Sequence, residues 1–156
     1  MTGRAPDAGC VFCGIAAGTV AATVVLRDDA VCAFLDQRPV FKGHVLIVPR
    51  GHVGTLLDAD PSELAAVFGA AQRVARAMES ALAADGSFLG VNTTVSQSVP
   101  HLHVHVVPRR RKDGLRGFFW PRVPYSSDEE REEIGARLRA ALATMTVELP
   151  SGGPAR

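Results

Sequence analysis

The sequence predicts an α+β fold. Its apolar runs are short and bounded by turn residues, and one long amphipathic stretch separates them, so the expected order is strands, a helix, two strands and a second helix. The connections are short enough for antiparallel pairing, whereas parallel strands would need longer crossovers. A chain of 156 residues is also the size of one domain with a single hydrophobic core.

The first elements follow from local patterns. "CVFCGIAAG" (10–18) predicts a short helix that stops at Gly18. "TVVLRDDAVCAFLD" (23–36) contains two apolar runs around a polar turn at 27–29, which indicates a hairpin. "GHVLIVPR" (43–50) predicts a third strand that is apolar on both faces and is closed by Pro49.

The longest helix has the clearest signals. Asp60 can cap its N-terminus, Pro61 suits the first turn, and Glu63 completes a capping box. We expect it to end at Gly86. Apolar residues follow at helical spacing: Leu64, Val67, Phe68, Ala71, Val74, Ala75, Met78 and Leu82.

Two further strands are predicted at 87–92 and 101–108, followed by a second main helix. That helix starts at Ser127, and its acidic first turn, residues 128–130, suits the positive end of a helix dipole. It continues through Ile134, Leu138 and Leu142.

Composition excludes several classes of protein. The net charge of +1 provides no overall attraction to nucleic acid or to a membrane surface. The first ten residues lack an apolar segment, and no run of 18 apolar residues occurs, which argues against secretion and against membrane spanning. Three cysteines, an odd number, argue against a disulfide framework, so we expect a cytoplasmic protein.

The segment "HLHVHV" (101–106) carries a histidine at every second position. In a strand, His101, His103 and His105 share one face, and the apolar residues between them face the core. A solvated face of the sheet is the alternative to a functional site. The outer two histidines would lie about 13 Å apart. Since zinc–nitrogen bonds are only about 2.0–2.1 Å, all three cannot bind one metal without a bend.

A second cluster comes from the C-x-x-C formed by Cys10 and Cys13, whose spacing favours zinc or a redox pair. A redox pair is expected in a βαβ unit, which this chain lacks. Zinc needs two more ligands, and His44, His52 and the three histidines of 101–105 are the candidates. We predict a structural zinc on Cys10, Cys13, His52 and His101, with two reduced, metal-free cysteines as the alternative. Cys32 lies in an apolar strand and is expected to pack in the core.

The spacing H-φ-H-φ-H-φ-φ in "HLHVHVV" resembles the motif of the histidine triad (HIT) superfamily of nucleotide hydrolases and transferases. The resemblance extends over about residues 10–109, through "CVFCGIAAG" and "GHVLIVPRGHV" to "QSVPHLHVHVVPR". It implies a five-stranded antiparallel sheet with two main helices, a homodimer, and chemistry at the α-phosphate of a nucleotide. It also implies one HIT domain over 10–146 with the triad region at 92–109. The polar, Pro- and Gly-containing composition of the two ends predicts a flexible N-terminus over 1–9 and a disordered tail over 147–156.

The resemblance also implies a role for each site residue. His103 would attack phosphorus and form a nucleotidyl-histidine, and a backbone carbonyl would hold its other nitrogen as a donor. His105 would donate to phosphate oxygens as charge shifts in the transition state. His101 would support the triad and bind zinc. The remaining contacts are phosphate and leaving-group contacts from Gln97 and Ser98, a ribose contact from Asp36, walls for the base from Phe12, Ile15 and Phe34, and a position near the phosphate for Asn92.

Each binding role has a structural alternative. Asp36 could be only a turn residue, the three apolar residues could belong to the core, and Asn92 could only terminate its strand.

Two segments depart from the family pattern. Only "TTVS" (93–96) stands between Asn92 and Gln97, shorter than a glycine-rich loop, and Ser96 replaces a glycine. Downstream, "RRRKDGLRGFFWPR" (109–122) combines six basic residues with three aromatic ones, which can hold phosphates and stack on a base, or can form a solvated basic loop.

Together these features predict a zinc-stabilised hydrolase or transferase of a purine (adenine) nucleotide derivative. The substrate would be a dinucleoside polyphosphate or a nucleoside phosphoramidate, and the sequence does not separate these two. The alternatives are a nucleotide-binding regulatory module with little catalysis, and removal of 5'-adenylate from nucleic-acid ends through residues 109–112. A small nucleotide is expected as the partner, and neither a membrane nor a nucleic acid is.

Overall fold

A computed structural model describes residues 4–115 and 123–144 of the chain. Two compact units divide it, residues 1–113 and residues 114–156, and each is described by itself. The predicted tail at 147–156 and the three aromatic residues of 109–122 lie outside the described residues, as do residues 1–3 of the predicted N-terminal segment.

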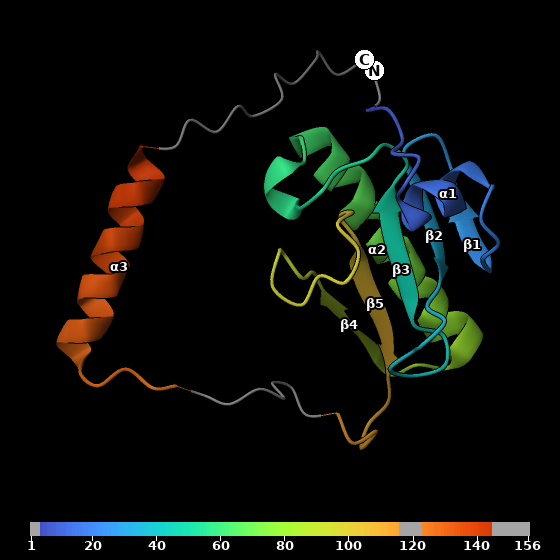
Figure 1. Cartoon of the computed structure of the whole chain (residues 1–156). Coiled ribbons are helices and arrows are strands. Elements are labelled where there is room, and N and C mark those ends of the chain that lie inside the picture. The colour runs from blue at the N-terminus through green and yellow to red at the C-terminus, as the bar shows by residue number, and fades with distance from the viewer. Residues whose placement is uncertain (1–3, 116–122, 145–156) are drawn as a thin grey trace, which may run out of the picture. The chain divides into compact units, whose positions relative to one another are not determined.

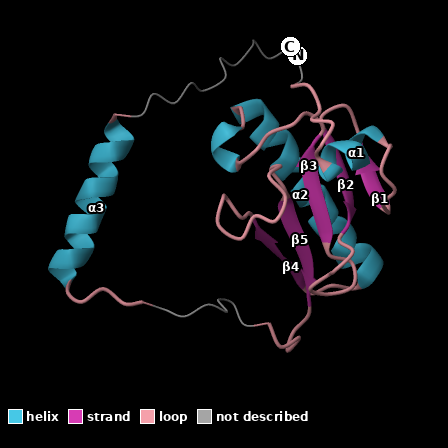
Figure 2. Ribbon diagram, in the orientation of Figure 1, coloured by secondary structure: helices cyan, strands magenta, loops and turns pink. Residues whose placement is uncertain are grey.

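The first unit is built on a five-stranded antiparallel sheet in the order β1-β2-β3-β5-β4 (Figure 1). This confirms the predicted sheet. Figure 2 shows the strands side by side in magenta, with β1 and β4 at the edges. The strands are β1 Val24–Arg27, β2 Val31–Leu35, β3 Val45–Pro49, β4 Gly86–Gly90 and β5 Val104–Arg109.

Helix α2, Pro61–Leu82, covers one face of the sheet. Asp60 and Glu63 form the predicted capping box at its start. The prediction that it extends to Gly86 is wrong. Ala83 adopts the left-handed conformation, with φ of 51°, and ends the helix, so Gly86 is free to begin β4.

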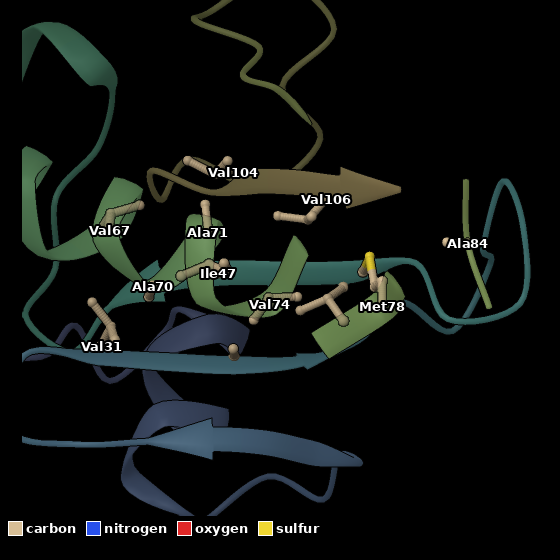
Figure 3. Close-up of a cluster of buried hydrophobic side chains, with 12 residues drawn as sticks. Val31, Ile47, Val67, Ala70, Ala71, Val74, Met78, Ala84, Val104 and Val106 are labelled. Carbon is tan, nitrogen blue, oxygen red and sulfur yellow. The ribbon is translucent and has the colours of Figure 1, made fainter. Parts of the chain in front are cut away.

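The core lies between α2 and the sheet (Figure 3). Because side chains alternate along a strand, odd-numbered residues of β2 and β3 face α2 together with even-numbered residues of β5. Ile47, Val67 and Val104 are fully buried there. The opposite face of β2 and β3 packs against α1, Val11–Ala17, through Phe12, Ile15, Cys32, Phe34, Leu46 and Val48. Helix α1 ends at Gly18 as predicted, with φ of 84°.

Strand β5 begins later than predicted. Its ladder with β3 starts where Val104 pairs with Ile47, so His101 and His103 precede the strand. The chain there bonds to a loop instead, since the N–H of Leu102 donates to the carbonyl of Val53 at 2.6 Å. His101 is therefore not held to the flat face of the sheet.

Two further elements complete the description. A 3₁₀ turn, Leu56–Asp58, is capped by Thr55 and was not expected from the sequence. In the second unit, α3 spans Asp128–Ala143, and Ser127 caps it as predicted by accepting from the N–H of Glu130. None of the helices among the described residues is both long and apolar enough to cross a membrane.

The core predicts a large difference between two truncations. Ile47→Ala removes a fully buried side chain from the centre of the sheet and should lower the free energy of unfolding by about 2–5 kcal/mol. Leu57→Ala, at a side chain that is 83% exposed, should change it by less than about 0.5 kcal/mol. Urea unfolding followed by circular dichroism measures both. Equal losses would contradict the assignment of Ile47 to the core.

Candidate active site and metal cluster

A cavity of about 400 Å³ opens on the α1 side of the sheet. Helix α1 contributes one wall, β2 and β3 contribute the floor, and residues upstream of β5 close another side. The predicted site residues that line it are Phe12, Ile15, Phe34, Asp36, Ser98, His103 and His105. The structure therefore brings together residues from four separate segments of the chain.

His103 is buried beside this cavity and makes one short hydrogen bond. Its Nδ1–H donates to the backbone carbonyl of His101 at 2.7 Å. A carbonyl only accepts, so Nδ1 carries the proton and Nε2 of the neutral ring carries the lone pair. This is the hydrogen bond to a carbonyl that was expected for His103. The ring of Phe12 meets the imidazole edge-on, with centroids 5.2 Å apart, and helps to fix its plane.

A chain of hydrogen bonds sets the proton on His105. The N–H of Val40 lies 3.3 Å from Nδ1 of His44 and donates to it, so His44 carries its proton on Nε2. His44 Nε2 lies 3.0 Å from His105 Nδ1 and donates to it. Asp36 Oδ2 lies 3.4 Å from His44 Nδ1, within ion-pair distance but without a hydrogen bond to it, so the direction set by Val40 holds.

His105, the last residue in this series of hydrogen bonds, has one N–H donor that is not used within the series. His105 must carry its own proton on Nε2, and that atom is buried with no hydrogen-bond partner among the described residues. The His103 and His105 ring centroids are 5.0 Å apart. The site therefore places an imidazole lone pair next to an unused imidazole N–H, the pair of groups that attack at phosphorus and stabilisation of a phosphate oxygen require.

Burial keeps this chain of histidines neutral. Burial, together with the neighbouring His103 and His44, lowers the pKa of His105 to about 4. Burial also lowers the pKa of His44, against an opposing effect of Asp36. At neutral pH the two rings therefore hold one proton each, as the hydrogen-bond chain requires.

The shortened loop at 93–96 takes a strained path. Thr94 and Ser96 both have positive φ, 65° and 61°, which glycine adopts more easily than other residues. Gln97 holds this loop by accepting from the N–H of Thr94 at 2.9 Å and by donating to the carbonyl of Gly54 at 2.7 Å. Neither Gln97 nor the exposed Asn92 lines the cavity, so the structure does not bring these two residues together with the other seven.

Beside the active-site cavity, two thiols and two imidazoles converge. Sγ of Cys10 lies 3.3 Å from Nδ1 of His101, and Sγ of Cys13 lies 3.4 Å from Nδ1 of both His52 and His101. The four candidate ligand atoms lie within 4.8 Å of one another. A tetrahedron with bonds of about 2.0–2.3 Å has edges of about 3.3–3.8 Å, so these residues fit a Cys₂His₂ zinc site.

Hydrogen bonding prepares His101 for a metal. Its Nε2–H donates to the carbonyl of Pro49 at 3.0 Å, which leaves the Nδ1 lone pair facing the thiols. Burial lowers the pKa of His101 to about 4, so the ring is neutral and able to coordinate. Burial also raises the pKa of the Cys13 thiol, which favours a protonated sulfur while no cation is near.

His44 is the site residue whose position the sequence prediction missed. It was considered only as a zinc ligand, but it lies beside His105 rather than with the cysteines. Alternation along the chain could have placed it, since His44, just before β3, is two residues from Leu46, which pairs with His105.

Two of the basic residues at 109–112, at the end of β5 and just after it, bond to other parts of the same chain. Arg109 forms a bidentate ion pair with Asp113, in which Nε donates to Oδ2 at 2.6 Å and Nη2 donates to Oδ1 at 2.9 Å. Arg110 donates to the carbonyls of Leu82 and Ala83 at the end of α2. Two of the four cations at 109–112 thus stabilise the fold, which weakens the case for a nucleic-acid surface there.

Several curated proteins are similar in sequence to this chain. An uncharacterised HIT-like protein of Mycobacterium tuberculosis is 38% identical over 139 residues, covering 86% of this chain and 93% of its own. Two relatives from Schizosaccharomyces pombe carry names of enzymes. A bis(5'-nucleosyl)-tetraphosphatase is 36% identical over 60% of this chain and 53% of its own, and an adenosine 5'-monophosphoramidase is 27% identical over 83% and 98%.

Among solved structures, a zinc-bound histidine triad family protein of Mycobacterium smegmatis is 40% identical, with a TM-score of 0.67 over 86% of this chain and 94% of its own. The family model for the HIT domain matches residues 17–112, which include the three histidines and all five strands of the sheet. The chain belongs to the HIT domain family.

Proposed function

We propose that this protein hydrolyses an adenine nucleotide derivative at its α-phosphate through a covalent intermediate on His103. The observation that carries the proposal is the pair of fixed tautomers beside the cavity. Nε2 of His103 carries a lone pair, and the N–H on Nε2 of His105 has no hydrogen-bond partner within residues 4–115 and 123–144. The relatives named as a nucleosyl tetraphosphatase and a phosphoramidase support the same reaction class.

The reaction takes two displacements. Nε2 of His103 attacks the α-phosphorus, and the bond from phosphorus to the leaving group breaks with its electron pair. His105 Nε2–H donates to a phosphate oxygen as negative charge builds up there. Water then attacks phosphorus, the phosphorus–nitrogen bond breaks, and the electron pair returns to His103 while the water loses a proton to solvent.

The walls of the cavity suit a nucleoside. We assign contact with the base to Phe12, Ile15 and Phe34, which are buried around the cavity, and contact with the ribose hydroxyls to Asp36. Ser98 lines the cavity and is assigned to the phosphate side. Phosphate contacts of Gln97 and Asn92 stay predictions, and Gln97 has a second role in holding the 93–96 loop.

We further propose that Cys10, Cys13, His52 and His101 hold a structural zinc. The converging donor set supports it, as does the zinc-bound M. smegmatis relative. Bound zinc would supply a cross-link between α1 and the segment that precedes β5, without taking part in the reaction. Reduced thiols fit a cytoplasmic location, and the family resemblance favours a homodimer.

His103→Ala should reduce kcat for adenosine phosphoramidate and for a dinucleoside polyphosphate by about a thousandfold or more, because the attacking nitrogen is lost. Steady-state kinetics with both substrates measures this, and their relative kcat/KM separates the two substrate classes. Arg73→Ala, on the exposed side of α2, is the matched control and should keep full activity. Turnover by His103→Ala at the wild-type rate would refute the nucleophile.

Purified protein should contain about one zinc per chain by elemental analysis. The double variant Cys10→Ser, Cys13→Ser should lose that zinc and unfold at a lower temperature, because metal binding contributes to folding free energy. Full zinc content in the double variant would refute the site.

Stability should fall in mild acid because His105 is buried in its neutral form. Its pKa is about 4 in the folded chain, against an ordinary value of 6.5. Between these values the unfolded chain binds a proton that the folded chain does not, so the free energy of unfolding falls as pH drops from 6.5 to 4. Urea titrations of zinc-free protein should show a shallower fall for His105→Asn than for wild type. Parallel curves would contradict the assignment.

A further inference from the structure

Residues 4–7 form no helix or strand, and they lie against the candidate zinc site formed by Cys10, Cys13, His52 and His101. We call them the N-terminal strap. The N–H of Asp7 donates to Sγ of Cys13 at 3.3 Å. Two residues earlier, the carbonyl of Ala5 accepts from the N–H of His52, also at 3.3 Å. The strap therefore contacts two of the four candidate zinc ligands through its backbone.

Arg4 anchors the other end of the strap. Its guanidinium donates to the carbonyl of Asp58 at 2.5 Å and lies 3.5 Å from Glu63 and 3.9 Å from Asp60. Those three residues form the turn before α2 and the start of that helix. The strap thus spans from the first turn of α2 to the cysteines of α1.

A glycine makes room for this path. A Cβ added at Gly51 would come within 2.7 Å of the Arg4 carbonyl oxygen and within 3.2 Å of its nitrogen. Both are backbone atoms, so an alanine there requires the strap itself to move. Gly51 precedes the ligand His52 and does not have a positive φ, so the absence of a side chain, rather than backbone freedom, is what the strap requires.

We propose that the N-terminal strap retains zinc in the Cys10/Cys13/His52/His101 site and sets the rate at which zinc leaves it; this rests on the zinc site proposed above. The Asp7 N–H stabilises negative charge on the Cys13 sulfur, which a zinc-bound thiolate carries and a thiol does not. Ala5 fixes the backbone of His52, so its ring stays aligned. Partners that orient metal ligands typically change metal affinity by about 10–100-fold when they are lost.

Three variants disturb the strap without substituting a candidate zinc ligand. Gly51→Ala pushes the Arg4 backbone away, and its control, Gly69→Ala, adds the same methyl group where no atom lies within 4 Å. Asp7→Pro removes the N–H donor, and its control, Asp7→Ala, loses the same carboxylate but keeps that N–H. Arg4→Ala, at an exposed side chain, is a milder variant that is expected to fold in any case.

Zinc-loaded full-length proteins are mixed with excess 4-(2-pyridylazo)resorcinol, and zinc transfer to the dye is followed by absorbance. Gly51→Ala and Asp7→Pro should release zinc about tenfold or more faster than wild type. Arg4→Ala should release it about two- to threefold faster, while both controls should stay at the wild-type rate. Far-ultraviolet circular dichroism checks the fold of each variant.

Wild-type release rates in Gly51→Ala and Arg4→Ala would refute the proposed role of the strap in zinc retention, but would not refute the zinc site itself. Wild-type protein that binds no zinc would overturn the zinc site, and the strap proposal with it. The two failures are distinguished by the zinc content of the wild-type protein before mixing.

Discussion

The backbone carbonyl of His101 accepts the Nδ1–H of His103, and the rest of the site depends on this one hydrogen bond. It determines which nitrogen of His103 is free to attack. The same residue faces the cysteines through its Nδ1 and bonds to Pro49 through its Nε2. One residue thereby joins the candidate zinc site to the proposed nucleophile, so a disturbance of that site would reach His103 through a single peptide unit.

Pairing within the sheet positions His105, the second histidine of the cavity. Pairing of β3 with β5 places His105 opposite Leu46, and the hydrogen bond from His44, just before β3, then directs the free proton of His105 to Nε2. Val104 and Val106 face the opposite way, into the core under α2. The alternation that buries these valines therefore also holds His105 toward the cavity, and packing on one face supports chemistry on the other.

Patterns within a single element predicted the start of α2 and the stop at Gly18, and the family resemblance implied the five-stranded sheet. The C-x-x-C spacing and the small number of histidines led to the set Cys10, Cys13, His52 and His101, whose ligand atoms the structure brings together. Three other features were not predicted. The late start of β5 arises because Leu102 bonds to Val53, and the end of α2 arises at an alanine in a conformation that glycine usually adopts. His44 was missed because its role depends on pairing between β3 and β5.

Hydrogen bonding to the carbonyl of His101 fixes His103 as the Nδ1–H tautomer and leaves the lone pair on Nε2. Imidazole ¹⁵N spectra of the zinc-loaded protein at neutral pH, correlated through bonds to the ring protons, report the tautomer of each histidine directly. This tautomer assignment predicts a protonated Nδ1 and an unprotonated Nε2 for His103, and the reverse for His105. A protonated Nε2 on His103 would contradict it, because that nitrogen could not then attack phosphorus.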